Sequence, residues 1–266
     1  MTSLAMSMAM TGVASAAAIR TGFSSNTLAA NDDLSTGAVA LGFTANFFGT
    51  NYTQTYVNNN GNITFKNASG STTQALNTAT TPTIAPFFAD VDTRGIGNTP
   101  VTYGQGLVNG RNAFAANYVN VGYYSQGTDK LNSFQVVLID RADTGAGNFD
   151  IEFNYDKIQW DQGGTARVGY SNGLAGTANI LSFELPGSNV NGAFLDGGSN
   201  SLATRTINTN GILGRDIFSA RNGAVAIASS STPTASVPEP FTIVGTLMGA
   251  GAALRLRKRL KVTNKL

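Results

Sequence analysis

Two aspartates, Asp90 and Asp92, stand one residue apart at the end of an apolar run that begins at Ile84. In an extended chain, residues two apart share a face, so the pattern places both carboxylates on one side and Val91 on the other, toward a core. Paired carboxylates at the edge of a sheet can ligate calcium. The stretch is therefore a calcium site or, more simply, a buried strand that ends in a solvated acidic turn. Pro86 cannot donate to a sheet ladder, which favours an edge strand or a strand start.

A second carboxylate pair, Asp150 and Glu152, alternates with apolar residues further along the chain. With Asp90 and Asp92, these residues are the candidates for an enzyme that works with two carboxyl groups about 5–10 Å apart, as in glycoside hydrolysis. The alternation, however, predicts that Asp150 and Glu152 face solvent, where they would serve solubility.

A third grouping of carboxylates surrounds a turn at Asp140, Asp143 and Asp150 and could also hold calcium. None of these groups has the spacing of an EF-hand loop. The sequence contains no His and no Cys. These absences exclude a Ser-His-Asp triad, a Cys-His dyad and a typical zinc site. We therefore expect a non-enzymatic protein without a cofactor, apart from calcium as a possibility.

The elements that would position these carboxylates are short strands. The chain is 42% hydrophobic but only 12% charged, and its 31 glycines suit many tight turns. Residues 134–140 are nearly continuously apolar, as in a central strand. In residues 149–155, Phe149, Ile151, Phe153 and Tyr155 alternate with polar residues and should face inward. Predicted strands alternate with predicted turns along the chain. This pattern predicts an all-β, two-layer antiparallel β-sandwich.

A series of motifs resembles the nidogen-like (NIDO) extracellular domain over roughly half of the chain. The motifs are Phe47-Phe48-Gly49 with Tyr52, Val57 to Phe65 around Asn60-Gly61, Ile84 to Asp92, Asn132 to Leu138, and Phe153 to Trp160. Phe88 stands where the family usually has tryptophan. The resemblance implies cell–matrix adhesion and names no ligand, and a fold alone does not establish a function.

The N-terminal residues 1–18 are small and apolar, and Ala14-Ser15-Ala16 reads as the cleavage site of a secretory signal peptide, although a basic start is missing. A disordered Ala-rich terminus is the alternative. Residues 19–228 would form the NIDO-like β-sandwich domain. Residues 229–237 are rich in Ser, Thr and Pro and read as a linker.

The C-terminal region has three parts: a Val237-Pro238-Glu239-Pro240 motif, an uncharged run over residues 241–254, and a basic cluster. The basic cluster comprises Arg255, Arg257, Lys258 and Arg259. The run would make a short transmembrane helix of about 21 Å, against a hydrocarbon core of about 30 Å. Residues 238–259 resemble the PEP-CTERM sorting signal, which implies processing by an exosortase, and residues 260–266 form a tail. A permanent tail anchor is the alternative.

The tail after Pro240 holds six of the 17 basic residues, so the remaining chain is mildly acidic and nucleic-acid binding is not expected. We expect an exported protein that crosses the inner membrane, is held there transiently by its C-terminal helix, and reaches the cell surface or the extracellular space. Its expected role is cell–matrix adhesion or exopolysaccharide and biofilm association, with matrix polysaccharide or protein as partner. The alternatives are a carboxylate-dependent enzyme on extracellular polymer and a tail-anchored membrane protein.

Overall fold

The computed structural model describes residues 17–70, 72–209 and 211–226, and these residues form two β-sheets with three short 3-10 helices in the connections. The all-β prediction is confirmed. Both sheets are antiparallel except for one parallel pair, β13 with β14.

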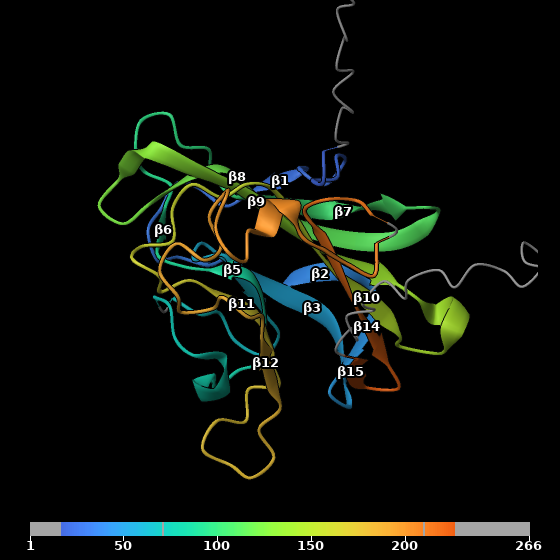
Figure 1. The fold of residues 1–266 in the computed structure, drawn as a ribbon. Helices are drawn as coiled ribbons and strands as arrows, with labels where there is room; N and C mark the ends of the chain where they lie inside the picture. Colours follow the sequence, from blue (N-terminus) through green and yellow to red (C-terminus); the bar gives the residue numbers. More distant parts are fainter. Residues whose placement is uncertain (1–16, 71, 210, 227–266) are drawn as a thin grey trace, which may run out of the picture. The chain divides into compact units, whose positions relative to one another are not determined.

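The larger sheet has nine strands in the order β1-β7-β8-β9-β10-β14-β13, with β15 beside β14 and β6 beside β8 (Figure 1). Its strands are β1 (Asn26–Thr27), β6 (Val91–Asp92), β7 (Thr102–Val108), β8 (Arg111–Tyr123), β9 (Gly127–Asp140), β10 (Phe149–Lys157), β13 (Thr206–Ile207), β14 (Arg215–Arg221) and β15 (Ala224–Ala226). The apolar run 134–140 lies in β9, between β8 and β10, and is central as predicted.

The smaller sheet has six strands in the order β12-β11-β5-β4-β3-β2. They are β2 (Val39–Phe47), β3 (Thr50–Asn58), β4 (Asn62–Thr64), β5 (Thr83–Phe88), β11 (Arg167–Ser171) and β12 (Ser182–Glu184). The 3-10 helices are η1 (Leu76–Thr78), η2 (Ala142–Thr144) and η3 (Leu202–Thr204). Phe48 and Gly49 join β2 to β3 in a tight turn with φ of 51° and 83°.

The core lies between the two sheets and is largely aromatic and aliphatic. The side chains predicted to face inward from β10 are buried, with Phe149, Ile151 and Phe153 fully so. Phe87 of β5 packs against Phe134 of β9, with ring centroids 5.2 Å apart, and this contact joins the two layers. The predicted sandwich core is therefore confirmed.

The strand β5 is an interior strand, so the prediction of an edge or a strand start at Pro86 is wrong. β5 lies between β4 and β11. Its register with β11 shifts where Phe88 pairs with Arg167 and Ala85 pairs with Gly169, leaving Pro86 within a β-bulge. A bulge has an unpaired position that does not need an N–H donor, which is how proline is tolerated inside a sheet.

The turn at Asn60-Gly61 requires its glycine. Gly61 has φ of 78°, and a Cβ there would lie 1.9 Å from the carbonyl oxygen of Phe87. That close approach lets the N–H of Phe87 donate to the carbonyl of Gly61 at 3.3 Å. The Asn-Gly step thus brings the β3–β4 turn onto the end of β5, where the aspartates follow.

The N-terminal segment, residues 18–25, covers the outer face of the larger sheet. The N–H of Arg20 donates to Gln135 Oε1 at 3.0 Å, and Gln135 Nε2 donates to the carbonyl of Arg20 at 2.8 Å. Phe23 is buried in a small apolar cluster on β7, β8 and β9. Glu152 is consequently fully buried. Asp150 is buried as well. The predicted exposure of both carboxylates is wrong, because alternation identifies two faces of a strand but not what packs on the polar face.

The contacts of Ala18 limit where the predicted signal peptide could be cleaved without loss of structure. Ala18 is buried, its N–H donates to Asp156 Oδ1 at 2.7 Å, and its carbonyl accepts from Arg215 Nη2 at 2.5 Å. Cleavage after Ala16 would keep these bonds, whereas a leader ending at residue 18 would remove them. If the predicted signal peptide is removed, we therefore expect the mature chain to begin at Ala17. Mass spectrometry of its N-terminal peptide checks this, and a chain that starts at residue 19 would contradict it.

The signal residues Ala14 and Ala16 lie outside the described residues, as do the linker 229–237, the motif around Glu239, the basic cluster and the tail. The membrane span expected over residues 241–254 lies outside them too. Within the described ranges, no helix is long and apolar enough to cross a membrane.

Candidate functional site

The structure separates Asp90 and Asp92, which the sequence pattern placed together. Asp90 lies in the break between β5 and β6 and is half-buried. Asp92 lies in β6 and is fully buried, while Val91 between them belongs to the core as predicted. The strand is interrupted at Asp90, so the two-residue periodicity of a continuous strand does not apply across it.

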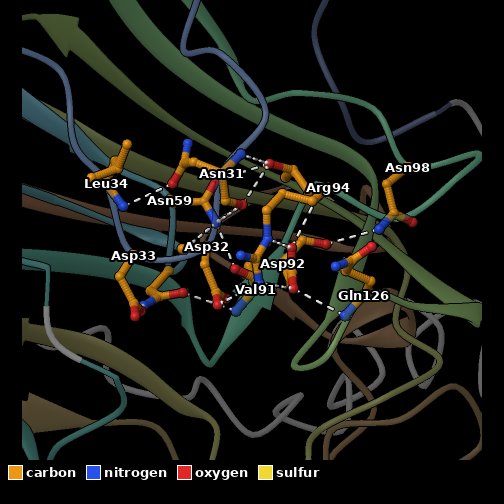
Figure 2. A network of polar contacts seen from close by, with 12 residues as sticks. Asn31, Asp32, Asp33, Leu34, Asn59, Val91, Asp92, Arg94, Asn98 and Gln126 are labelled. Atoms are coloured by element: carbon orange, nitrogen blue, oxygen red, sulfur yellow. Dashed lines mark hydrogen bonds and ion pairs between the residues drawn. The ribbon is translucent and has the colours of Figure 1, made fainter.

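Both oxygens of the Asp92 carboxylate are occupied by protein donors (Figure 2). Oδ1 accepts from Nε of Arg94 at 2.9 Å and from the N–H of Arg94 at 3.0 Å. Oδ2 accepts from Nη2 of Arg94 at 2.7 Å and from the N–H of Gln126 at 2.9 Å. Burial pushes the pKa of Asp92 upward, but the hydrogen bonds from Arg94 and Gln126 hold the pKa below its ordinary value. Asp92 therefore serves as a structural anchor for the β8–β9 hairpin.

Asp90 instead meets two aspartates that the sequence pattern did not single out, Asp32 and Asp33. One carboxylate oxygen from each of the three lies within 4.8 Å of the others. Asp32 Oδ2 also accepts a hydrogen bond from Nη2 of Arg94 at 2.7 Å. We call Asp32, Asp33 and Asp90 the acidic corner. Among the described residues, it is the one place where three carboxylates converge in this way.

Two buried asparagines of the β3–β4 turn, Asn59 and Asn60, bind the segments that carry the acidic corner, and Figure 2 shows Asn59 beside Asp32. Asn59 Nδ2 donates to the carbonyls of Asp32 and Val91, each at 2.5 Å, and so joins the Asp32 loop to β6. Asn60 Nδ2 donates to Asp33 Oδ1 at 2.8 Å. The asparagine-rich turn is thus a scaffold for the carboxylates.

The electrostatics of the acidic corner disfavour three separate negative charges. Burial raises the pKa of Asp90, and the charges of Asp32, Asp33 and Asp92 raise it further. Burial and the charge of Asp92 also raise the pKa of Asp32, against the opposing effect of Arg94. Asp32 Oδ1 is buried without a hydrogen-bond partner in the described part of the chain. A hard cation with oxygen ligands would relieve this repulsion.

Calcium binding stays a prediction. Its expected ligands are now Asp90 with Asp32 and Asp33, and Asp92 is no longer among them. If the corner binds calcium, the free energy of unfolding should rise by about 1.4 kcal/mol at a calcium concentration ten times the dissociation constant. The effect should weaken as the pH falls, because protons compete for carboxylates of raised pKa. Calorimetric melting with and without calcium measures it.

The matched variants are Asp90→Asn, which should lose the calcium effect, and Asp129→Asn, which should keep it. Asp129 is an exposed carboxylate paired with the hydroxyl of Tyr123 at 2.7 Å. An equal calcium shift in Asp90→Asn and the unaltered protein would place any bound calcium elsewhere.

Asp143, Asp150 and Glu152 are paired with arginines, whereas Asp140 Oδ1 accepts the N–H of Ala142 at 3.0 Å. Asp150 is held between Arg141 Nη1 at 2.7 Å and Arg221 Nη2 at 2.5 Å. Asp143 pairs with Arg141 and Arg111, whose hydrogen bonds lower its pKa to about 2. The predicted grouping of Asp140, Asp143 and Asp150 is therefore not one of the converging carboxylate groups in the described residues. The sequence offered no signal for these pairings, because the arginines come from several strands and turns.

Asp32 and Asp33 were missed although they are adjacent in sequence and follow Asn31, a turn-forming residue. Asn31 Oδ1 accepts the N–H of Leu34 at 2.8 Å, which closes the loop that carries them. The doublet was a visible signal of an exposed acidic turn. Its convergence with Asp90 depends on the asparagine contacts and could be found only in three dimensions.

Fold and site together define a two-sheet antiparallel β-protein that carries a carboxylate cluster on its loops. The chain matches the family model described as NIDO related over residues 14–212. It therefore belongs to the NIDO-related family, as the resemblance in its motifs implied. Neither a curated protein nor a solved structure matches the chain.

Proposed function

We propose that the protein is an exported, non-enzymatic adhesion protein that binds extracellular matrix material through its NIDO-related domain. The observation that carries this proposal is the family match, which covers residues 14–212 and thus nearly the whole β-domain. Its binding surface would be formed by loops at the ends of strands, where the acidic corner lies.

The pairing of carboxylates supports the non-enzymatic part of the proposal. Asp92, Asp150 and Glu152, three of the four enzyme candidates, have arginine partners within 2.7 Å. A general acid in glycoside hydrolysis needs a carboxyl that can release its proton to the leaving group. Carboxylates fixed to guanidinium groups are poorly suited to that step.

The adhesion proposal is tested by binding of the full chain to extracellular matrix isolated from its native host. We expect saturable binding that survives washing at physiological salt and is lost when the protein is unfolded with urea. Another all-β protein of similar size and net charge is the control for nonspecific adsorption. Binding no stronger than that of the control would overturn the adhesion role.

The export part of the proposal rests on the C-terminal signal and is tested separately. Under this proposal an exosortase removes the tail near Pro238, Glu239 and Pro240, and the domain passes from the inner membrane to the surface or medium. Intact mass and cell fractionation should find a shortened species there, and Glu239→Ala should abolish it. Thr234→Ala in the adjacent linker is the matched control. A full-length chain in the inner membrane for both variants and the original protein would favour the permanent tail anchor.

A further inference from the structure

A groove adjoins the acidic corner and shares Asp90 with it. The groove has a volume of about 740 Å³, within the range of about 300–1,000 Å³ that is usual for ligand sites. Its walls come from the β8–β9 hairpin, with Tyr124 and Lys130, and from the turn after β10, with Gln159 and Trp160. None of these residues was assigned a binding role by the sequence motifs.

The aromatic side chains of the groove offer a flat apolar surface. Tyr124 is 62% exposed, although burial of so large a ring would be favourable. Its N–H donates to the backbone carbonyl of Asp90 at 3.0 Å, which fixes the Tyr124 backbone beside Asp90. Trp160 also lines the groove, but it is only 4% exposed and belongs to the core, and its Nε1 donates to the carbonyl of Val121 at 3.1 Å. Trp160 therefore supports the wall, and Tyr124 presents the exposed ring.

The polar side chains of the groove surround this surface with planar hydrogen-bonding groups. Gln159 Oε1 accepts the N–H of Leu131 at 3.0 Å, which orients the amide and directs its two N–H bonds away from that contact. Asn191 is an exposed lining residue and can both donate and accept. Asp90 is an acceptor at the end nearest the acidic corner. A polymer whose units carry hydroxyl groups matches this mixture of donors and acceptors, because each hydroxyl can both donate and accept a hydrogen bond.

The charges of the groove favour a neutral polymer over an anionic one. Asp90 lies among the carboxylates of Asp32 and Asp33, against the single lysine Lys130 in the lining. A polyanion would meet this negative cluster at one end of the groove. A protein partner is a poorer match, because the lining includes the charged residues Asp90, Lys130 and Asp161, and charged residues are depleted at the centre of protein interfaces.

We propose that this groove binds a strand of neutral polysaccharide, with the Tyr124 ring against the C–H face of one sugar and Asp90 and Gln159 hydrogen-bonded to hydroxyl groups. The C–H face of a pyranose ring is apolar and carries partial positive charge, which complements the negative face of an aromatic ring. The inference rests on the proposed adhesion function and names the partner class at one site.

Binding can be followed with the protein's own fluorescence, because Trp160 is the only tryptophan in the sequence. The full chain is titrated with dextran, hydroxyethyl cellulose and galactomannan as neutral polymers and with alginate as the anionic one, and calorimetry gives the affinities. We expect at least one neutral polymer to shift the emission and bind saturably, and alginate to bind more weakly. Exclusive binding of alginate, or binding of none of the four, would overturn the inference.

Variants at Tyr124 locate the binding site. Tyr124→Ala should weaken binding of the neutral polymer roughly tenfold, whereas Tyr124→Phe should keep most of it, because the ring and not the hydroxyl makes the stacking contact. Leu107→Ala is the matched control, since Leu107 is 66% exposed and lies on β7. Equal affinity of Tyr124→Ala and the original protein would overturn the proposed site.

The failure of this inference can be told apart from failure of the adhesion role. If Tyr124→Ala binds isolated host matrix as well as the original protein does, adhesion stands and the groove is not its site. If the original protein does not bind matrix but binds a purified neutral polymer through Tyr124, the adhesion role fails and the groove assignment stands.

Discussion

Glu152→Ala is expected to lower the free energy of unfolding by about 3–5 kcal/mol, because it removes the fully buried carboxylate that lies between Arg20 and the buried Arg215. Glu152 Oε1 accepts from Arg20 Nε at 2.6 Å and lies 3.4 Å from Arg215 Nε. Its Oε2 accepts from Arg20 Nη2 at 2.8 Å. Burial lowers the pKa of Arg215, and the charge of Glu152 opposes that shift while Arg20 adds to it. Without Glu152, the buried guanidinium of Arg215 would lose a carboxylate partner and remain close to the positive charge of Arg20.

Urea denaturation with the full chain measures this loss, and a double-mutant cycle assigns it to the pair. Arg20→Ala combined with Glu152→Ala should cost clearly less than the sum of the two single substitutions. Asp143→Ala is the control, because Asp143 is in an exposed ion pair and its removal should change stability little. A Glu152→Ala loss no larger than the Asp143→Ala loss would mean that the buried cluster does not stabilise the fold.

Asp216 is expected to make the domain more stable as the pH falls from about 7 to about 4. Asp216 lies in β14, is fully buried, and has Arg205 Nε 3.0 Å from its Oδ2. This ion pair is poorly aligned, since neither oxygen has a hydrogen-bond partner of good geometry in the described residues. Burial therefore raises the pKa of Asp216 to about 6, against the charge of Arg205.

The direction of this pH effect follows from comparing proton binding by Asp216 in the folded and unfolded states. An unfolded aspartate has a pKa near 3.9, so the folded state binds this proton more tightly and gains stability as the pH falls between the two values. Two pKa units correspond to about 3 kcal/mol between the fully ionised and fully protonated limits. Asp216→Asn cannot take up the proton and should lose this part of the pH dependence.

Urea midpoints at a series of pH values from 4 to 8 measure the difference between Asp216→Asn and the original protein. The two curves should diverge as the pH falls through 6, with the original protein gaining. Asp143→Asn is the contrasting variant, because the pKa of Asp143 is lowered to about 2 and its contribution is lost only at more acidic pH. Parallel curves for Asp216→Asn and the original protein would show that Asp216 does not titrate in this range.

Much of the sandwich could be predicted because its core positions repeat with the period of a strand. Phe149, Ile151, Phe153 and Tyr155 carry that signal, and all four are buried. The opposite face of the same strand was assigned wrongly. Glu152 pairs there with Arg20 and Arg215, and Asp150 pairs with Arg141 and Arg221. Alternation within one strand contains no information about such partners.

The candidate site was predictable only in part for a similar reason. Asp90 was found because it follows an apolar strand, but its pairing with Asp92 assumed an unbroken strand. The interruption between β5 and β6 and the contacts of Asn59 and Asn60 decide which carboxylates meet. Pro86 gave an incorrect edge assignment because the sequence did not indicate that a bulge would accommodate it.

The short strand β15 would have a mechanical consequence if the residues that follow it held the domain at a surface. Among the described residues β15 pairs with β14 alone, and its last residue, Ala226, stands opposite Ser219 at the open end of the hairpin. Tension applied beyond Ala226 would therefore break the hydrogen bonds of this hairpin one after another, at low force. β14 would resist next, because it is paired with β10 along six residues and holds Arg215 and Asp216 in buried positions. The attachment would thus yield by a short, reversible extension before the load reaches the core.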